Sequence, residues 1–506
     1  MARVTSRRAS RDLPPTGIGA ATRPGADPGP ATTGPGPDAG LTADELVAIT
    51  GGTLLSRSDR LVRDGTVDSR AVEPGNLFVA LPGEQTDGHA YVGAALAAGA
   101  AAALVARDPD RPDLAGHDAT VIRVDDPLRA VQAIGAAWRR RFDPLVVGVT
   151  GSIAKTSTKE AIAAVLGAAL PTLKNEGNLN NEIGLPLTVL RLRAGHRAAV
   201  LEMGMYVGGE IADLARIGRP EIGVVTAVQP VHLSRIGTIE AVAKAKAELI
   251  EELPDDGVAV LNADDERVAA MADLTRAEIV TYGFSPTAAV RAEDVVSLGP
   301  DGMAFELVAR AGRRPARIPN LGRLAVHNAL AAAAVGLAAG IAIDTVVEAL
   351  AAGSAAPHRG QVIRAGGILI VDDSYNASPA AVEAALELLG GLPGRRIAVL
   401  GEMLELGDGH VAGHERVGRA AAGIVDRLVV VGDRASDVAR GAREAGLAGA
   451  AIVEVPDRDA ALHELRSTLG PGDVVLVKAS RGIALDLLVD GLVAAFDGTT
   501  AGAERA

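Results

Sequence analysis

The sequence predicts an α/β protein with three domains, because three features of the chain agree. Its 506 residues are too many for one hydrophobic core. Short apolar stretches alternate with helical patterns, which indicates mostly parallel sheets. Polar side chains follow where the apolar stretches end, and open α/β sheets bind their ligands beyond the carboxyl ends of the strands. These polar residues are Thr150, Lys155, Glu202, His232, Asp372, Asp373 and Lys478.

Composition excludes several classes of protein. The net charge is −13, from 50 basic and 63 acidic residues, which argues against a general nucleic-acid binder. Cysteine is absent, which removes disulfides, cysteine-ligated zinc and a thiol nucleophile. No run approaches about 18 apolar residues without a charge. No apolar signal segment is present near the N-terminus. We therefore expect no membrane span and a cytoplasmic location.

The first part of the chain is expected to contain a tail and one domain. Residues 1–40 hold seven prolines and seven glycines without hydrophobic periodicity, which predicts disorder. An N-terminal α/β domain is expected over residues 41–140. It opens with a helix that Thr42 can cap, continues with a buried strand in residues 76–83, and ends with a helix near Arg140.

Two further open sheets are expected after this domain. A central domain over residues 141–355 has apolar strands LVVGVTG (145–151), RAAVLEMG (197–204), EIGVVTAV (221–228) and GVAVLNAD (257–264). A C-terminal Rossmann-like domain over residues 356–495 has strands GILIVDD (367–373), RRIAVLGEM (395–403), DRLVVVGD (426–433) and DVVLVKAS (473–480). Residues 496–506 are expected to be a second disordered tail.

The stretch GVTGSIAKTSTKE (148–160) has the form of a phosphate-binding loop between a strand and a helix. In such a loop Lys155 would neutralise the β- and γ-phosphates, and the Thr156 hydroxyl would hold Mg²⁺. The general pattern has glycine where this chain has Val149 and Ala154. The match is therefore weak by itself, and an ordinary strand–helix turn is the alternative.

Ala154 leaves a physical question open. In a left-handed backbone an alanine costs about 1 kcal/mol or somewhat more, whereas in a right-handed backbone it costs almost nothing. Its methyl group could also crowd a phosphate. In every case the backbone N–H, which is the group that binds phosphate, is retained.

Lys246 lies at an unusual position in the predicted helix 240–253. The stripe formed by Val242, Leu249 and Ile250 includes it, whereas Lys244 falls on the opposite face between acidic residues. One interpretation is a lysine that extends from the edge of the core to solvent. The other is a lysine directed into a site.

Glu202 and His232 each follow an apolar strand, and such a pair suits a divalent cation beside phosphate groups. Taken singly, each residue type at such a position is more often structural. Because the two come at matching strand ends, a metal site is favoured.

Several separated motifs resemble the Mur ligases, the ATP-dependent amide ligases of peptidoglycan precursor synthesis. They are VDSRAVEPGNLFVALPGEQTDGHAYV (67–92), TGSIAKTSTKE (150–160), NEGNLNNEIGLPLTVL (175–190), DDSYNASP (372–379), LGEMLELG (400–407) and VKASRG (477–482). The resemblance covers about residues 41–495. The family's own loop lacks the first glycine of the general pattern, which accounts for Val149 and leaves Ala154 as a departure.

The resemblance implies a fold and a reaction. The expected domains bind a uridine nucleotide (41–140), bind ATP in a P-loop ATPase-like parallel sheet (141–355) and complete the ligase (356–495). The DDSYNASP, LGEMLELG and VKASRG stretches are similar to those of the branch that adds D-alanyl-D-alanine to UDP-N-acetylmuramoyl-tripeptide. ATP and Mg²⁺ are the implied cofactors, and a monomer is expected.

The resemblance also assigns residue roles. ATP would contact Gly151, Ser152, Ile153, Ala154, Lys155, Thr156, Ser157, Asn328, Arg359 and Asp373. Mg²⁺ would contact Thr156, Glu202, His232 and Lys246, the last aligning with a lysine that is carbamylated in sister ligases. Lys155, Lys246 and His232 would be catalytic. The nucleotide-sugar peptide would contact Ser69, Arg70, Asn178 and Asn181.

Two alternatives stay open. The chain could be a sister or folylpolyglutamate-type ligase with another amino-acid substrate, or a catalytically dead homologue that binds the nucleotide sugar. Ala154 is what supports the second alternative. The stretch HLSRIG, which begins at His232, and the alanine of VKASRG also depart from the family pattern. These departures leave fine substrate contacts in doubt.

Overall fold

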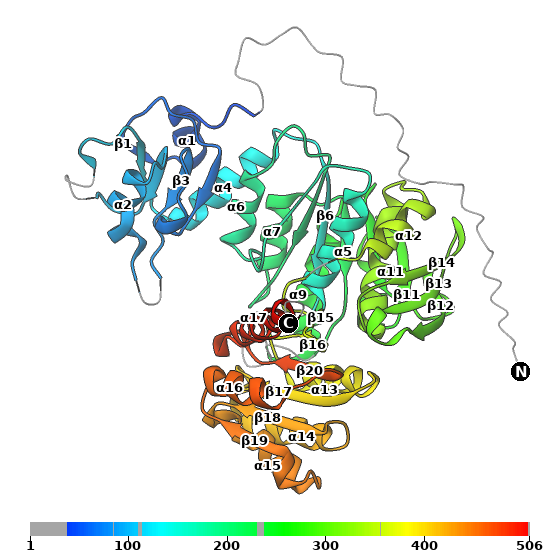
Figure 1. Ribbon diagram of the computed structural model, residues 1–506. Helices are drawn as coiled ribbons and strands as arrows, with labels where there is room; N and C mark the ends of the chain where they lie inside the picture. The colour runs from blue at the N-terminus through cyan, green and yellow to red at the C-terminus, as the bar shows by residue number, and fades with distance from the viewer. Residues whose placement is uncertain (1–37, 84–85, 110–113, 230–236, 355, 504–506) are drawn as a thin grey trace, which may run out of the picture.

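The computed structural model describes residues 38–83, 86–109, 114–229, 237–354 and 356–503, which form three α/β units (Figure 1). The described residues contain sheets of five, nine and six strands, one in each expected domain. The three-domain α/β fold predicted from the sequence is confirmed. Within these ranges no helix is long and apolar enough to cross a bilayer.

The N-terminal sheet has the order β1-β5-β4-β3-β2 and is parallel except for its edge strand β1. Its strands are β1 (Thr53–Ser56), β2 (Asp64–Thr66), β3 (Asn76–Val79), β4 (Ala102–Val105) and β5 (Thr120–Arg123). Its helices include α1 (Ala43–Thr50) and α2 (Val92–Ala97). Thr42 caps α1 as predicted, and a reciprocal bond from Glu45 completes the capping box.

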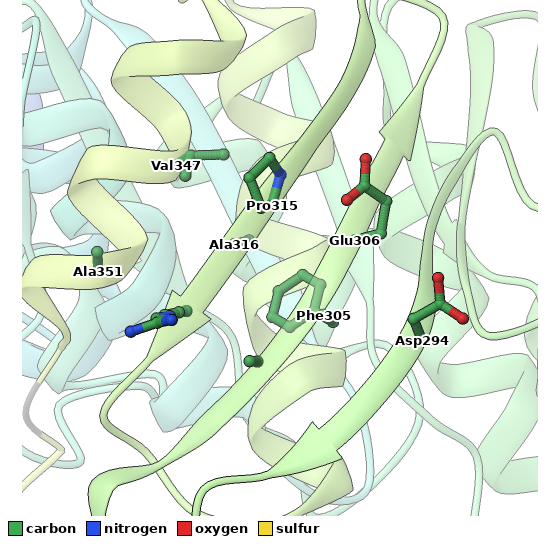
Figure 2. A pocket seen from close by; sticks show the side chains of 9 residues that line it. Asp294, Phe305, Glu306, Pro315, Ala316, Val347 and Ala351 are labelled. Atoms are coloured by element: carbon green, nitrogen blue, oxygen red, sulfur yellow. The ribbon is translucent and has the colours of Figure 1, made fainter.

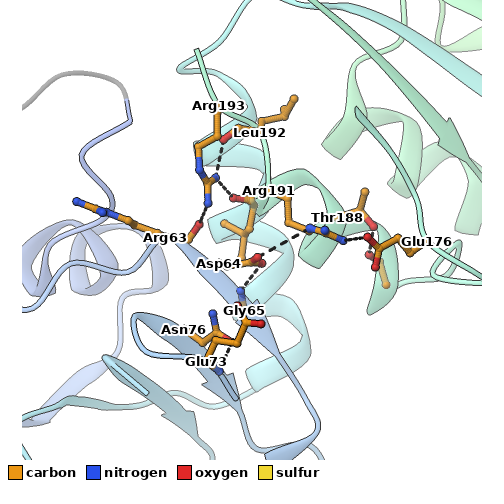
Figure 3. A network of polar contacts seen from close by, with 12 residues as sticks. Arg63, Asp64, Gly65, Glu73, Asn76, Glu176, Thr188, Arg191, Leu192 and Arg193 are labelled. Carbon is orange, nitrogen blue, oxygen red and sulfur yellow. Dashed lines mark hydrogen bonds and ion pairs between the residues drawn. The ribbon is translucent and has the colours of Figure 1, made fainter. Parts of the chain in front are cut away.

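Helix α4 (Pro127–Arg139) joins the N-terminal unit to the central one. Trp138 Nε1 donates to the Leu192 carbonyl at 3.2 Å, and Arg139 Nε donates to the Gly218 carbonyl at 2.8 Å. Beside α4, Arg191 lies between Asp64 of the first unit and Glu176 of the second (Figure 3). Since these bonds cross from one unit to the other, α4 fixes how the two pack.

The central sheet has the order β14-β13-β12-β11-β10-β9-β6-β8-β7. Its strands are β6 (Leu145–Thr150), β7 (Thr172–Lys174), β8 (Ala198–Glu202), β9 (Ile222–Val225), β10 (Val258–Asn262), β11 (Glu278–Gly283), β12 (Val290–Ser297), β13 (Met303–Ala309) and β14 (Gly312–Ile318). All pairings from β7 to β12 are parallel, and β12, β13 and β14 pair antiparallel. The carboxyl ends of β6, β8 and β9 therefore meet at one edge.

Helices cover both faces of this sheet. They are α5 (Lys155–Gly167), α6 (Gly184–Leu190), α7 (Glu210–Gly218), α9 (Ile239–Glu251), α10 (Glu266–Ala269), α11 (Arg323–Ala338) and α12 (Ile343–Ala352). Buried alanines of α11 pack against α5, which leaves the N-terminus of α5 at the carboxyl edge of the strands.

A hollow of 520 Å³ lies on the antiparallel end of the central sheet (Figure 2). Phe305, Glu306 and Pro315 of the β13–β14 hairpin line it, together with Val347 of α12. Several strands separate this hollow from β6, so it is distinct from the edge where the polar residues gather.

The C-terminal sheet has the order β15-β16-β20-β17-β18-β19 and is parallel except for β15. Its strands are β15 (Gln361–Ala365), β16 (Ile368–Asp372), β17 (Arg395–Gly401), β18 (Arg427–Val431), β19 (Ile452–Val455) and β20 (Asp473–Lys478). Its helices are α13 (Pro379–Gly390), α14 (His410–Ala422), α15 (Ser436–Glu444), α16 (Arg458–Thr468) and α17 (Asp486–Ala503).

The structure corrects the C-terminal tail that the sequence predicted. Helix α17 continues to Ala503, so residues 496–503, which the sequence placed in a disordered tail, are helical. Buried Leu488, Val489 and Leu492 anchor the first part of α17 on the sheet, and a helix that is already nucleated extends at little cost. Residues 1–37 and 504–506 lie outside the described residues.

A buried histidine supports the C-terminal domain. His414 of α14 accepts a bond from the Met403 backbone N–H at its Nε2 (2.9 Å), and its Nδ1 lies 2.7 Å from the His410 carbonyl. Burial lowers the pKa of His414, the bond to the His410 backbone raises it, and the charge of the nearby His410 ring lowers it again. The carboxylates of Asp437 and Glu402 act in the opposite direction. The neutral ring thus ties α14 to the segment after β17.

We predict that acid weakens this domain through His414. Its pKa in the folded chain lies below the ordinary 6.5, so between these two values the unfolded chain binds more protons. Stability should fall as pH drops through that window and stay flat above it. Urea unfolding from about pH 5 to about pH 8 measures the slope. His414→Gln, which retains an acceptor but does not titrate, should flatten it, and equal slopes in both proteins would contradict the prediction.

Candidate active site

The loop between β6 and α5 (residues 151–154) is clamped onto the segment that follows β9. A Cβ on Gly151 would lie 1.8 Å from Thr226 Oγ1, so this position accepts only glycine. Thr226 Oγ1 in turn donates to the Ile153 carbonyl at 2.6 Å, and the Ser152 N–H donates to the Ala227 carbonyl at 2.8 Å. The close approach therefore sets the path of the whole loop.

Ala154 answers the question that the sequence left open. Its backbone is left-handed, with φ 63° and ψ 3°. An alanine in this conformation costs about 1 kcal/mol, so the interpretation in which Ala154 is cost-free is wrong. Ala154 precedes α5 without providing a side-chain cap. The first N–H groups of α5 thus have no side-chain cap, and a helix terminus of this kind suits a phosphate.

Lys155 is the first residue of α5, and its Nζ donates to the Gly151 carbonyl at 2.9 Å. Burial lowers the pKa of Lys155, which Glu202 opposes and Arg359 reinforces. Arg359 belongs to the C-terminal domain, so cationic groups from two domains come together at this loop.

Lys246 on α9 is 2% exposed, whereas Lys244 is exposed on the opposite face. A lysine that extends to solvent would expose its ammonium group. The burial of Lys246 therefore argues against the interpretation that its side chain reaches solvent from the edge of the core. Burial holds the pKa of Lys246 well below its ordinary value, and the charge of Lys155 lowers it further. Within the described ranges Lys246 makes no hydrogen bond or ion pair. Lys246 is therefore a buried lysine close enough to Lys155 for the two charges to interact.

Glu202 ends β8 and is 1% exposed. Its Oε1 accepts a bond from Asn180 Nδ2 at 2.6 Å, whereas its buried Oε2 has no hydrogen-bond partner among the residues that the structure describes. A buried carboxylate oxygen without a donor is costly unless a cation or a ligand satisfies it.

These residues fit a divalent cation, because Glu202 Oε2 needs a positive partner and the Thr156 hydroxyl stands at the start of α5. No three His, Cys, Asp or Glu side chains cluster as a metal site among the residues that the structure describes. His232, the other imidazole ligand expected from the sequence, lies outside them. The oxygen donors of Thr156 and Glu202 therefore make an incomplete cation site, which needs further ligands.

The predicted nucleotide contacts from other elements lie around the same helix and the third sheet. Asn328 Oδ1 on α11 accepts from Thr158 Oγ1 of α5 at 3.1 Å. The Arg359 guanidinium lies 4.0 Å from the ring centre of Tyr375. Asp373, after β16, pairs with the buried Lys478 of β20. Asn328 thus contacts the first turns of α5, and Arg359, from the C-terminal domain, is near enough to lower the pKa of Lys155.

Three models of one family match most of the chain. The Mur ligase middle domain matches residues 149–336, the Mur ligase glutamate ligase domain residues 358–481, and the Mur ligase family catalytic domain residues 65–139.

The chain belongs to the Mur ligase family.

Relatives and solved structures agree with this assignment. A Mycobacterium tuberculosis protein named UDP-N-acetylmuramoyl-tripeptide–D-alanyl-D-alanine ligase is 41% identical over 90% of this chain and 98% of its own length. The crystal structure of MurF from Acinetobacter baumannii has a TM-score of 0.81 at 30% identity, over 90% of this chain and 99% of that one. MurF ligase from Thermotoga maritima, solved with ADP, has a TM-score of 0.74 at 28% identity, over 87% and 100%.

The predicted substrate residues of this Mur ligase lie away from the phosphate loop or serve local structure. Ser69 and Arg70 lie in the N-terminal domain. Arg70, with 87% of its side chain exposed, pairs with Asp68 and lowers the pKa of that carboxyl to about 2. Asn181 Oδ1 accepts from the N–H of Gly184, where α6 begins. Asn178 is exposed on the same loop. Their contacts with substrate stay predictions.

Sequence reasoning missed three residues of the Mur ligase site. Asn175 and Asn180 both bond Glu202, and Lys159 bonds the Asn175 carbonyl. The repeated asparagines of NEGNLNNEIG were available as a signal, but the short strand β7 that precedes them was not predicted, so their place at the carboxyl edge of the sheet was not seen.

We predict that Ala154→Gly stabilises the central domain by about 1 kcal/mol, since glycine removes the left-handed strain. Scanning calorimetry should show the transition of this domain about 2 °C higher. Ala168→Gly, at a right-handed position with φ −67° after α5, is the matched control and should not stabilise. A lower transition temperature for Ala154→Gly would contradict the strain assigned to Ala154.

Proposed function

We propose that this Mur ligase joins D-alanyl-D-alanine to UDP-N-acetylmuramoyl-tripeptide in a reaction driven by ATP. The observation that carries the proposal is the unpartnered Glu202 Oε2 at the same edge as Lys155 and the uncapped start of α5. This set suits a nucleotide triphosphate with its cation. The acceptor is supported by relatives that carry this ligase name over nearly their whole length.

The reaction requires that a carboxylate oxygen become a leaving group. The tripeptide's terminal carboxylate attacks the γ-phosphorus of ATP, the bond to the β-phosphate oxygen breaks, and an acyl phosphate and ADP form. The free amine of D-alanyl-D-alanine then attacks the acyl carbon and loses a proton. The tetrahedral intermediate collapses to the amide and inorganic phosphate. The two steps together consume one ATP for each amide bond.

The residues of the loop act on the first step. The N–H groups at the start of α5 hold phosphate oxygens, and Lys155 offsets the negative charge that develops on the transferred group. Thr156 and Glu202 would hold Mg²⁺, with His232 and a carbamylated Lys246 as the further predicted ligands. When bound, Mg²⁺ supplies charge neutralisation at the phosphates. Carbon dioxide reacts with the neutral form of an amine, and burial shifts the pKa of Lys246 in the direction that favours this form.

The C-terminal domain protects the intermediate. An acyl phosphate must be kept from water, and Arg359 brings this domain close enough to influence Lys155. Asp373 and Arg359 stay the predicted nucleotide contacts on this side, and Asn328 stays the predicted adenine contact. The monomeric state and the cytoplasmic location expected from the sequence stay predictions.

A protein that binds the nucleotide without turnover is the second candidate, and the strained Ala154 is the observation that favours it. Against it, the chain retains Lys155, Thr156, Glu202 and Lys246, which are residues predicted to act in the reaction. Because a strain of about 1 kcal/mol is small beside a catalytic barrier, it does not by itself remove activity.

We predict that Lys155→Ala lowers phosphate release at least about a hundredfold, since the charge on the transferred phosphoryl group loses its partner. The assay supplies ATP and UDP-N-acetylmuramoyl-tripeptide, with and without D-alanyl-D-alanine. Lys244→Ala, on the exposed face of α9, is the control and should keep the wild-type rate. Normal D-alanyl-D-alanine-dependent release by Lys155→Ala would refute the role of Lys155.

The same assay separates the rival functions. Wild-type release that depends on D-alanyl-D-alanine supports the proposal, whereas release that depends on glutamate would indicate a sister or folylpolyglutamate-type ligase. ADP binding without any release would indicate the non-catalytic homologue.

A further inference from the structure

The loop of residues 175–181 encloses the carboxylate of Glu202. We propose that Asn180 is a positioning residue, which holds Glu202 so that Oε2 is directed at the cation. The proposal rests on the proposed function in one respect, namely that Glu202 is a cation ligand.

Asn180 distinguishes the two oxygens of the Glu202 carboxylate. Its Nδ2 donates to Oε1 at 2.6 Å, while Oε2 is buried and has no partner in the described part of the chain. A carboxylate with one oxygen fixed in this way cannot rotate freely about its last bond. The free oxygen therefore keeps one direction, which is the requirement for a preorganised ligand.

Asn180 is itself fixed by β8 and the residues after it. The Gly204 N–H donates to the Asn180 carbonyl at 2.8 Å. A Cβ on Gly204 would lie 3.0 Å from Asn180 Oδ1, closer than nearly all real contacts of this kind. The absence of a side chain at residue 204 thus makes room for the Asn180 amide beside the strand end.

A second asparagine, Asn175, anchors the start of the same loop. Asn175 is fully buried, and its Oδ1 accepts from the Glu202 N–H at 2.6 Å. Its Nδ2 donates to the Leu179 carbonyl at 2.6 Å. The buried Lys159 of α5 donates to the Asn175 carbonyl at 2.7 Å and pairs with Glu160 at 3.0 Å. A continuous set of buried bonds therefore runs from α5 through the loop to Glu202.

The choice of an amide has a chemical reason. An amide donates a hydrogen bond without adding charge, so Glu202 keeps its full negative charge for the cation. A lysine at residue 180 would neutralise Glu202, and an aspartate would offer it no proton at neutral pH. Because Asn178 and Asn181 are predicted substrate contacts, Asn180 also links the substrate loop to the cation ligand.

The test measures cation binding directly, without turnover. Mn²⁺ is titrated into the full chain with a non-hydrolysable ATP analogue, and free Mn²⁺ is followed by electron paramagnetic resonance. Asn180→Ala should bind Mn²⁺ about tenfold or more weakly than wild type, as expected when a partner of a metal ligand is removed. Asn180→Ser, a smaller change whose hydroxyl is too short to reach Oε1, should show the same loss.

The control and the melting temperature separate positioning from folding. Leu179→Ala changes an exposed side chain on the same loop and should leave Mn²⁺ binding unchanged. A merely structural role would lower the melting temperature of the Asn180 variants and leave Mn²⁺ affinity within about twofold of wild type, which would overturn the proposal. Failure of wild type itself to bind Mn²⁺ with the analogue would instead overturn the proposed function, and the positioning role with it.

Discussion

The close approach of Gly151 to Thr226 is the contact on which the rest of the site depends. It forces the loop after β6 against the segment after β9, and the bonds from Thr226 and Ser152 then fix the loop's carbonyl and N–H groups. With that path set, α5 begins at Lys155 without a side-chain cap. The helix terminus, Lys155 and the end of β8 consequently share one edge of the sheet, where the phosphates of a nucleotide find both donors and positive charge.

The site concentrates positive charge around a single buried carboxylate. Burial and the charge of Lys155 lower the pKa of Lys246. Burial also lowers the pKa of Lys155, where Glu202 opposes the shift and Arg359, from another domain, adds to it. An arrangement of this kind is unfavourable by itself and is stabilised by a polyanion that enters with its cation. The asparagine loop contributes by holding Glu202 in one orientation. The strained Ala154 fits the same pattern, because backbone strain is stored at functional sites when the surroundings fix it.

The sequence predicted the parts of the fold that depend on local pattern. The buried strands β3, β6, β10 and β20 are continuous apolar runs, and Thr42 capped its helix as expected. The hairpin strands β12 to β14 were missed, because their alternation is irregular: the register of β12 shifts at Asp294, whose backbone is left-handed, and Arg314 lies on the same side of β14 as the buried Ala316. The backbone at Ala154 could not be predicted, since alanine is compatible with two conformations. The bonds of Asn180 and the approach of Arg359 depend on contacts between distant segments, which no local spacing encodes.

The most direct test of this account is the affinity of Gly151→Ala for ADP, measured by calorimetry on the full chain. The new methyl group would overlap Thr226 Oγ1, shift the loop and remove charge-assisted N–H bonds to phosphate, so binding should weaken about a hundredfold or more. Gly167→Ala, at the other end of α5 where a Cβ meets nothing within 4 Å, is the matched control and should bind ADP as wild type does. ADP affinity of Gly151→Ala equal to that of Gly167→Ala would contradict the claim that this contact builds the phosphate site.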